Sequence, residues 1–177
     1  MKTNIIIGHS SKNQGASDEN NGITEFMYNN SVAYNILRIK GNDEINIIYR
    51  NNSYIKLPSE VDKKKSDLNI CLHLNAFNKT AEGSEVLSSG SKNSMIFANI
   101  IAPKMAELFS VDNRGVKIRD DGRGANMLIN TKAPTVILEP FFIDNDNNLE
   151  LDEMRLKEYA QLICDCIDEY KKIVYNE

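Results

Sequence analysis

Tryptophan is absent from the sequence, and histidine, cysteine and proline are scarce, with two, three and four residues among 177. The cysteines Cys71, Cys164 and Cys166 are odd in number, and the last two share a segment with a helical pattern. We therefore expect free thiols and no disulfide framework. No apolar run is long enough to span a bilayer. The N-terminal apolar stretch is too short for a secretory signal, so we expect synthesis in a cytoplasm without a signal peptide.

Positive charge is not in excess. The chain has 21 Lys and Arg residues against 25 Asp and Glu residues, for a formal net charge of −4. Proteins that hold nucleic acid or an anionic membrane by charge usually show the opposite balance. We interpret the one compact basic run, Lys63–Lys65, as a solvated helix face. Neither nucleic acid nor a membrane is therefore expected as a partner.

Short segments rich in Ile and Val alternate with longer segments of helical period, a pattern typical of an α/β fold with a mostly parallel sheet. The length suits one domain with its own core, so residues 1–177 are interpreted as a single domain. Residues 111–131, rich in Gly, Asp and Arg, are expected to form a long irregular connection that lines a groove. Strands are predicted at 4–8, 45–49, 68–73, 83–88 and 135–139, and helices at 23–39, 93–109 and 150–174.

Both histidines stand at the carboxyl end of an apolar, strand-like segment. His9 follows IIIG and His73 follows NICL, while TVILE ends in Glu139 and is followed by Pro140, which cannot continue a central strand. Open α/β sheets bind ligands outside the carboxyl ends of their strands, so these three side chains are expected to converge at one edge. A carboxylate at the end of a buried strand also requires a positive partner or a chemical role.

Two histidines and one acid can bind zinc, and a further carboxylate can then act as a general base. Glu25, which follows a polar loop at the start of the first helix, is the first candidate for the acidic ligand, and Glu19 and Asp18 are alternatives. Each residue alone has a structural explanation; the helix dipole, for example, favours an acid at position 25. No HExxH or CxxC spacing specifies the geometry, so the pattern alone leaves a metal site and a structural role equally open.

Four segments, in this order and spacing, resemble the zinc-dependent N-acetylmuramoyl-L-alanine amidases with a type-3 catalytic domain, and within them the endolysins of clostridial phages. The resemblance covers nearly the whole chain. It implies a twisted, mostly parallel sheet flanked by helices. It also implies a peptidoglycan hydrolase that cleaves the amide between the lactyl group of N-acetylmuramic acid and L-alanine of the stem peptide. The segments are IIIGHS with GAS (5–10 and 15–17), TEFMYN (24–29), CLHLNA with GSEVL (71–76 and 83–87) and APTVILEPFFIDN (133–145).

The resemblance also implies roles for individual residues. His9, Glu25 and His73 match the residues that bind one Zn²⁺ ion, and Glu139 matches the catalytic acid/base. Glu139 would take a proton from the attacking water and pass it to the departing amine. Asn75, two residues past His73, is a further candidate for contact with glycan or stem peptide. The alternative is that Asn75 is a turn former.

The turn at 122–126 is a second candidate for groove contacts, with the same alternative explanation. Many family members have D-x-G-H-G around the first histidine, whereas here His9 is preceded by Ile7-Gly8 and followed by Ser10. Cys71 stands where family members often have serine. Strand alternation places Cys71 on the same face as His73 but two residues deeper. A buried packing role for Cys71 is therefore favoured over a role as nucleophile or ligand.

The expected partner is bacterial peptidoglycan, and the enzyme is expected to be a monomer without a separate cell-wall-binding domain. A phage endolysin of this kind would be made in the cytoplasm of the host bacterium and act on the cell wall. Two other functions stay open on the residues alone. One is a zinc- or sugar-binding module without turnover, and the other is a different metal hydrolase, such as a peptide deacylase or carboxypeptidase.

Overall fold

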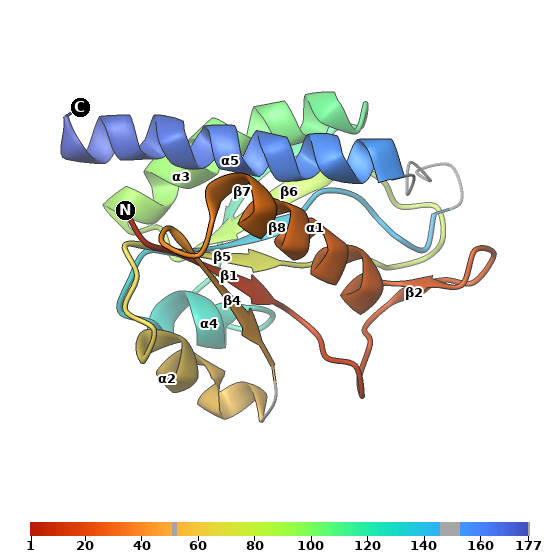
Figure 1. The fold of residues 1–177 in the computed structure, drawn as a ribbon. Coiled ribbons are helices and arrows are strands. Elements are labelled where there is room, and N and C mark those ends of the chain that lie inside the picture. Colours follow the sequence, from red (N-terminus) through yellow and green to blue (C-terminus); the bar gives the residue numbers. More distant parts are fainter. Residues whose placement is uncertain (51–52, 146–152, 177) are drawn as a thin grey trace.

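A six-stranded sheet lies between two layers of helices in the computed structural model, which describes residues 1–50, 53–145 and 153–176 (Figure 1). Four neighbouring strands are parallel; the fifth runs antiparallel to β8, and the sixth is parallel to the fifth. The expected α/β fold with a mostly parallel sheet is thus confirmed. In order across the sheet the strands are β4 (Ile45–Tyr49), β1 (Thr3–Ile7), β5 (Leu68–Leu72), β8 (Thr135–Glu139), β6 (Ser84–Ser88) and β7 (Asn113–Ile118).

Three long helices cover one face of the sheet and two short helices cover part of the other (Figure 1). The long ones are α1 (Glu25–Lys40), α3 (Lys92–Leu108) and α5 (Glu153–Tyr175), close to the predicted ranges. Residues 150–152 of the last predicted helix lie outside the described residues. The short helices are α2 (Leu57–Asp62), which follows a 3₁₀ turn (Tyr54–Lys56), and α4 (Ala125–Asn130).

Two apolar clusters fill the space on either side of the central strands. Successive residues of a strand point to opposite faces, so β8 sends Val136 and Leu138 toward the long helices and Ile137 toward the short ones. Glu139 has the same parity as Ile137 and ends the strand on the face of the short helices. Because both faces are covered, β1, β5 and β8 each contain an uninterrupted apolar run, at 5–7, 70–72 and 136–138. This is why they are readily predicted from sequence.

The prediction of an irregular connection over residues 111–131 was wrong. The structure places β7 and the six-residue helix α4 there. β7 is an edge strand whose residues are exposed or half-buried, so it lacks an apolar run, and α4 is too short to show a helical period.

The basic run Lys63–Lys65 is exposed as expected, but it lies in the turn after α2 and does not form a helix face. All three cysteines are buried free thiols. Within the described ranges, none of the helices has the length and apolar character needed to cross a membrane.

Candidate metal centre and active site

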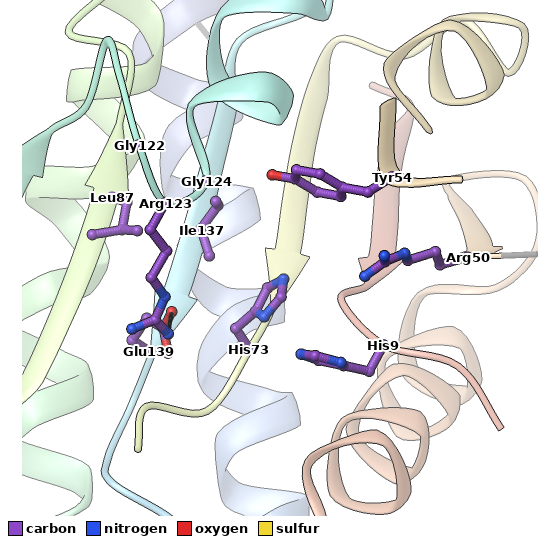
Figure 2. Close-up of a pocket in the computed structure, with 10 residues that line it drawn as sticks. All are labelled: His9, Arg50, Tyr54, His73, Leu87, Gly122, Arg123, Gly124, Ile137 and Glu139. Atoms are coloured by element: carbon purple, nitrogen blue, oxygen red, sulfur yellow. Dashed lines mark hydrogen bonds and ion pairs between the residues drawn. The ribbon is translucent and has the colours of Figure 1, made fainter. Parts of the chain in front are cut away.

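The carboxyl ends of β1, β5 and β8 meet at one edge of the sheet, as the sequence predicts. The parallel register pairs Ile7 with Leu72 and Leu72 with Leu138, which brings the residues after these positions side by side. His73 follows β5 directly, Glu139 is the last residue of β8, and His9 stands two residues past β1. Figure 2 shows these three side chains around a common pocket.

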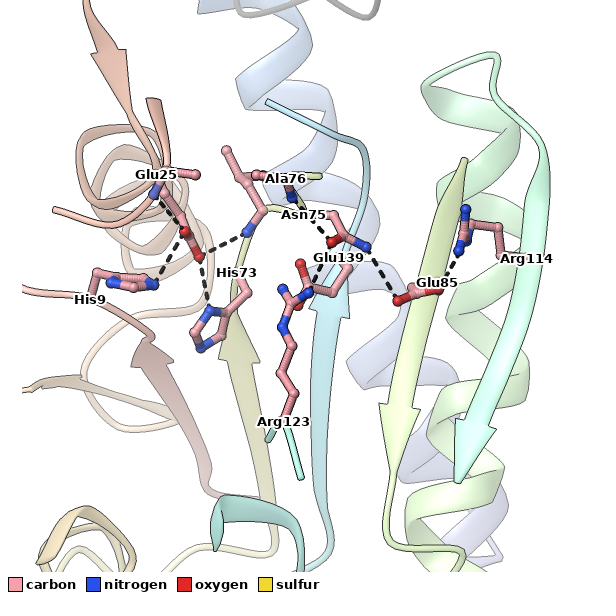
Figure 3. A network of polar contacts seen from close by, with 11 residues as sticks. His9, Glu25, His73, Asn75, Ala76, Glu85, Arg114, Arg123 and Glu139 are labelled. Carbon is pink, nitrogen blue, oxygen red and sulfur yellow. Dashed lines mark hydrogen bonds and ion pairs between the residues drawn. The ribbon is translucent and has the colours of Figure 1, made fainter. Parts of the chain in front are cut away.

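Glu25 is placed by the start of α1. Thr24 caps the helix, since its Oγ1 accepts a hydrogen bond from the Met27 backbone N–H at 3.2 Å. The backbone N–H of Glu25 also donates to the carbonyl of Ala16 at 2.8 Å, which ties the helix start to the preceding loop. The Glu25 side chain is buried and points from the first helical turn into the space between the two histidines (Figure 3).

The Glu25 carboxylate contacts both imidazole rings. Its Oε2 lies 3.2 Å from Nε2 of His9, and its Oε1 lies 2.8 Å from Nδ1 of His73. The backbone N–H of Leu74 donates to Oε1 at 3.0 Å, and that of Ala16 donates to Oε2 at 3.3 Å. These four contacts fix the position of the Glu25 carboxylate between the two histidines.

His9, Glu25 and His73 each offer one potential ligand atom, and the three atoms lie within 4.8 Å of one another. Two imidazole nitrogens and one carboxylate oxygen form a donor set that zinc prefers, and three protein ligands leave a position open, as in catalytic sites. The residues present therefore fit a zinc ion. Of the alternatives, Asp18 accepts hydrogen bonds from neighbouring asparagines and Glu19 pairs with Lys79, so neither faces the histidines.

Burial and mutual charge shape the protonation of this cluster. Burial raises the pKa of Glu25, but the hydrogen bond from His73 and the charges of both histidines outweigh it and bring the pKa below its ordinary value. Burial lowers the pKa of His73, but its bond to Glu25 makes the net shift upward. For His9 burial dominates and the pKa falls. The ionised Glu25 carboxylate is available to a metal ion, whereas His73, whose pKa is raised, would release its proton on binding one.

Glu139 lies in a different electrostatic setting. It is 1% exposed, its Oε1 accepts a hydrogen bond from Nη2 of Arg123 at 2.7 Å, and its Oε2 is buried without a hydrogen-bond partner among the described residues. Burial raises the pKa of this carboxyl to about 7, against the opposing charges of His73 and Arg123. A carboxyl with such a pKa can accept and return a proton near neutral pH.

Comparison with known proteins shows the family. The model of the N-acetylmuramoyl-L-alanine amidase family matches residues 4–169. The chain belongs to this family. It is a peptidoglycan amidase of the N-acetylmuramoyl-L-alanine amidase type. No curated protein matches it in a sequence search.

Solved structures agree with the fold of the amidase. The catalytic domain of an N-acetylmuramoyl-L-alanine amidase from Bacillus (Paenibacillus) polymyxa is 24% identical with a TM-score of 0.80, covering 96% of this chain and 98% of that one. The catalytic domain of an endolysin targeting Clostridia difficile is 27% identical with a TM-score of 0.75, covering 96% and 97%. An amidase structure from Neisseria meningitidis, described as putative, is 26% identical with a TM-score of 0.75, covering 94% and 93%.

The pocket lined by His9, His73 and Glu139 has a volume of about 330 Å³, within the range that holds small ligands. On one side Arg50 stacks over the Tyr54 ring, with its guanidinium carbon 5.1 Å from the ring centroid. The other side carries Arg123 and Glu139, with Leu87 and Ile137 (Figure 2). The amidase thus has a cationic side chain on each side of its two histidines.

Sequence reasoning missed Arg50 and Tyr54, and it included Arg123 only as part of a candidate turn, without a role of its own. Arg123 belongs to the turn at 122–126 that was expected to contact substrate, and Gly122 and Gly124 line the pocket beside it. Asn126 of that turn is used differently, because its side chain donates to the Tyr54 carbonyl at 2.7 Å. Arg50 and Tyr54 follow β4 without any motif, and only the sheet order, with β4 next to β1, could have indicated their position.

Asn75 is buried beside Arg123. Its Oδ1 accepts hydrogen bonds from Nη1 of Arg123 at 3.0 Å and from the Ala76 backbone N–H at 3.1 Å, and its Nδ2 donates to Glu85 at 3.2 Å. Cys71 is fully buried in the cluster under the short helices, and burial raises the pKa of its thiol to about 12. Cys71 therefore has a packing role, as expected from the sequence.

Proposed function

We propose that this amidase is a zinc hydrolase in which His9, Glu25 and His73 hold one Zn²⁺ ion and Glu139 is the catalytic acid/base. The bond cut is the amide between the lactyl group of N-acetylmuramic acid and L-alanine. The observation that carries the proposal is the buried Glu25 carboxylate, which contacts a ring nitrogen of each histidine, with three potential ligand atoms within 4.8 Å. When bound, zinc supplies Lewis-acid polarisation and lowers the pKa of water.

Glu139 supplies the proton transfer. Its Oε2 is buried without a hydrogen-bond partner in the described structure, and the pKa of the carboxyl is about 7. In its ionised form it removes a proton from the attacking water, and in its protonated form it delivers that proton to the leaving amine. No covalent intermediate with a protein side chain is required. The fully buried Cys71, with its raised thiol pKa, is not a nucleophile in this scheme.

The pocket walls bind the substrate in this proposal. Arg50 and Tyr54 on one side offer donors and an aromatic face to glycan or stem peptide, and Gly122 and Gly124 line the other side. Asn75 stays a proposed substrate contact, with its amide also bonded to Arg123. In this proposal the protein acts on peptidoglycan as a monomer and has neither nucleic acid nor a membrane as a partner.

We further propose that the protein acts as a phage endolysin or as its catalytic domain, made in the host cytoplasm. The 27% identity to the catalytic domain of an endolysin targeting Clostridia difficile, over 96% of this chain, supports this role. The test of this role is whether the purified protein lyses clostridial cells when it is added from outside. Failure to lyse such walls, while isolated peptidoglycan is digested, would favour a wall-remodelling role over lysis.

Two variants and one digest test the chemistry. Glu139→Ala should keep bound zinc and lose most wall hydrolysis, while His9→Ala should lose both. The control is Glu19→Ala, which removes an exposed acid outside the cluster and should change neither. Mass spectrometry of the digest should show peptides that begin at L-alanine and glycan with intact lactyl groups. Hydrolysis retained by Glu139→Ala would remove Glu139 from its role, and zinc binding without released peptides would indicate a module without turnover.

A further inference from the structure

The Arg123 side chain donates hydrogen bonds both to Glu139, the proposed acid/base, and to Asn75. Its Nη2 donates to Oε1 of Glu139 at 2.7 Å, and its Nη1 donates to Oδ1 of Asn75 at 3.0 Å (Figure 3). A guanidinium is planar and presents its N–H groups in a fixed fork, so two simultaneous bonds fix its orientation. The two oxygens of Glu139 are therefore not equivalent. Oε1 is bonded, and Oε2 is the oxygen without a partner in the described structure.

Asn75 is itself braced. Its Nδ2 donates to Oε1 of Glu85 at 3.2 Å, and Oε2 of Glu85 accepts from Nε of Arg114 at 2.9 Å. Glu85 pairs with Glu139 across the antiparallel strands β6 and β8, which brings two acids close together. Asn75 and Arg123 lie between these acids. The resulting chain runs through Glu139, Arg123, Asn75, Glu85 and Arg114; its charged members alternate in sign, and the neutral Asn75 lies between Arg123 and Glu85 (Figure 3).

The backbone beside Arg123 is adapted to this approach. Gly124 has φ of +82°, and a Cβ there would lie 2.6 Å from Cδ1 of Ile137 in β8. Only glycine combines that backbone conformation with such close contact to the strand. The loop therefore packs closely against β8 at Ile137, which lies two residues before Glu139. This places the guanidinium over the end of the strand although the Arg123 side chain is 56% exposed.

We propose that Arg123 is a positioning residue for Glu139, holding Oε1 so that Oε2 is the oxygen that exchanges the proton with water and the leaving amine. This inference rests on the proposed function, since it assigns a role relative to Glu139. A carboxyl without this bond can rotate about its terminal torsion, which has broad minima. The plane of the carboxylate would then take a wider range of angles, and a smaller fraction of molecules would hold an oxygen in the productive orientation.

The test uses purified variants of residues 1–177, loaded with zinc, and a soluble N-acetylmuramoyl peptide as substrate. Arg123→Ala should lower kcat about 10- to 100-fold, by analogy with the range found when hydrogen-bond partners of metal ligands are removed. KM should change much less, since a positioning role acts on the chemical step and not on binding. Zinc content should equal that of the wild type. Arg123→Lys keeps the charge but cannot form both bonds of the fork, so it should recover only part of kcat.

The matched control is Arg119→Ala, which removes the same charge from an exposed residue four positions earlier. It should leave kcat unchanged. If Arg123→Ala does not fold, Arg123→Gln, which keeps bulk and a donor, carries the same comparison. A wild-type kcat with raised KM would overturn the inference and make Arg123 a substrate contact. Loss of zinc from Arg123→Ala would overturn it as well.

A double variant separates this inference from the function on which it rests. If Arg123 acts through Glu139, adding Arg123→Ala to Glu139→Gln should lower the remaining rate no further. A multiplied loss in the double variant would show that Arg123 acts independently and would overturn the inference alone. Wild-type activity in Glu139→Gln would instead refute the proposed acid/base, whatever Arg123 does.

Discussion

The backbone of Gly8 packs so closely against the ring of His73 that a Cβ on Gly8 would lie 2.1 Å from both Cε1 and Nε2 of that ring. The Gly8 N–H also donates to the carbonyl of Leu72 at 3.1 Å, which joins the end of β1 to the end of β5. Glycine at position 8 therefore leaves the space that the His73 imidazole fills. The orientation of His73, one proposed zinc ligand, therefore depends on the absence of a side chain at Gly8, which directly precedes His9, another proposed ligand.

Gly8→Ala should consequently impair metal binding while the protein still folds. The added methyl group forces the His73 ring away from Glu25, and we expect zinc affinity to fall at least about tenfold, with hydrolysis falling in parallel. Overpacking should also cost about 1–3 kcal/mol of stability. Calorimetric zinc titration measures the first effect. The control is Gly22→Ala, where a Cβ meets nothing within 4 Å; at φ +66° the alanine should cost stability through backbone strain, but zinc affinity should stay unchanged. Unchanged affinity in Gly8→Ala would mean that His73 does not bind the ion.

Removal of the metal should lower thermal stability as well as abolish hydrolysis. A ligand that binds only the folded state at 100 times its Kd contributes about 2.7 kcal/mol. For a chain of this length that corresponds to a Tm about 5–10 °C higher with zinc than after chelation. Differential scanning calorimetry with and without zinc measures it. His73→Ala should show no zinc-dependent shift, and a shift of wild-type size in this variant would place the ion elsewhere.

Glu139 should make the stability of the chelated protein depend on pH. Its pKa is about 7 in the fold against an ordinary 4.5, so between these values the folded state keeps a proton that the unfolded chain has lost. Stability from this group is thus present below pH 4.5 and declines as pH rises through 7, by roughly 3 kcal/mol. Glu139→Gln lacks this decline. Urea unfolding of both proteins from pH 4 to 8 should show wild type losing stability relative to the variant, and parallel curves would contradict the raised pKa.

The central strands were predictable because their burial is two-sided. Ile5, Ile6 and Ile7 are all fully buried, so each appears in the sequence as part of an uninterrupted apolar run. The edge strand β7 offers no such run: it contains Arg114 and Lys117, both exposed. The antiparallel direction of β6 also left no trace, because burial on two faces looks the same in either direction.

The proposed zinc ligands were predictable for a related reason. His9 and His73 follow parallel strands, and strand ends of one direction meet at one edge. Arg123 could not be found this way. It lies 16 residues before Glu139 in the sequence, between two glycines and within no periodic element, and only the folded loop brings its guanidinium to the carboxylate. Contacts made by irregular loops depend on backbone conformations that a residue pattern does not encode.

Cys71 should be dispensable for catalysis. It is buried in the apolar cluster beneath α2 and α4, and burial raises its thiol pKa to about 12, so almost no thiolate exists at neutral pH. Cys71→Ala should retain kcat and lose roughly 1 kcal/mol of stability from the small cavity. Thiol-directed reagents should not inactivate the folded wild type. Inactivation that is absent in Cys71→Ala would show that the thiol is accessible and functional.

Thr24 links the stability of α1 to the placement of Glu25. Its Oγ1 accepts from the Met27 N–H at 3.2 Å and donates to Oε1 of Gln14 at 2.8 Å, so one hydroxyl joins the first helical turn to the loop that carries His9. Thr24→Ala should cost about 1 kcal/mol of unfolding free energy, the usual effect of losing an N-cap.

Because the helix then begins less rigidly, Glu25 should be less well oriented, and zinc affinity should fall together with stability. Ser31→Ala provides the control: it removes a hydroxyl in the same helix, seven residues on, which donates only to a carbonyl of the preceding turn at 3.1 Å. Alanine is the better helix former there, so stability and zinc affinity should be preserved. Denaturant unfolding and zinc titration of both variants decide the matter. A destabilised Thr24→Ala that binds zinc with wild-type affinity would mean that the cap serves the helix alone, and that the backbone bonds from Ala16 and Leu74 are sufficient to hold the Glu25 carboxylate.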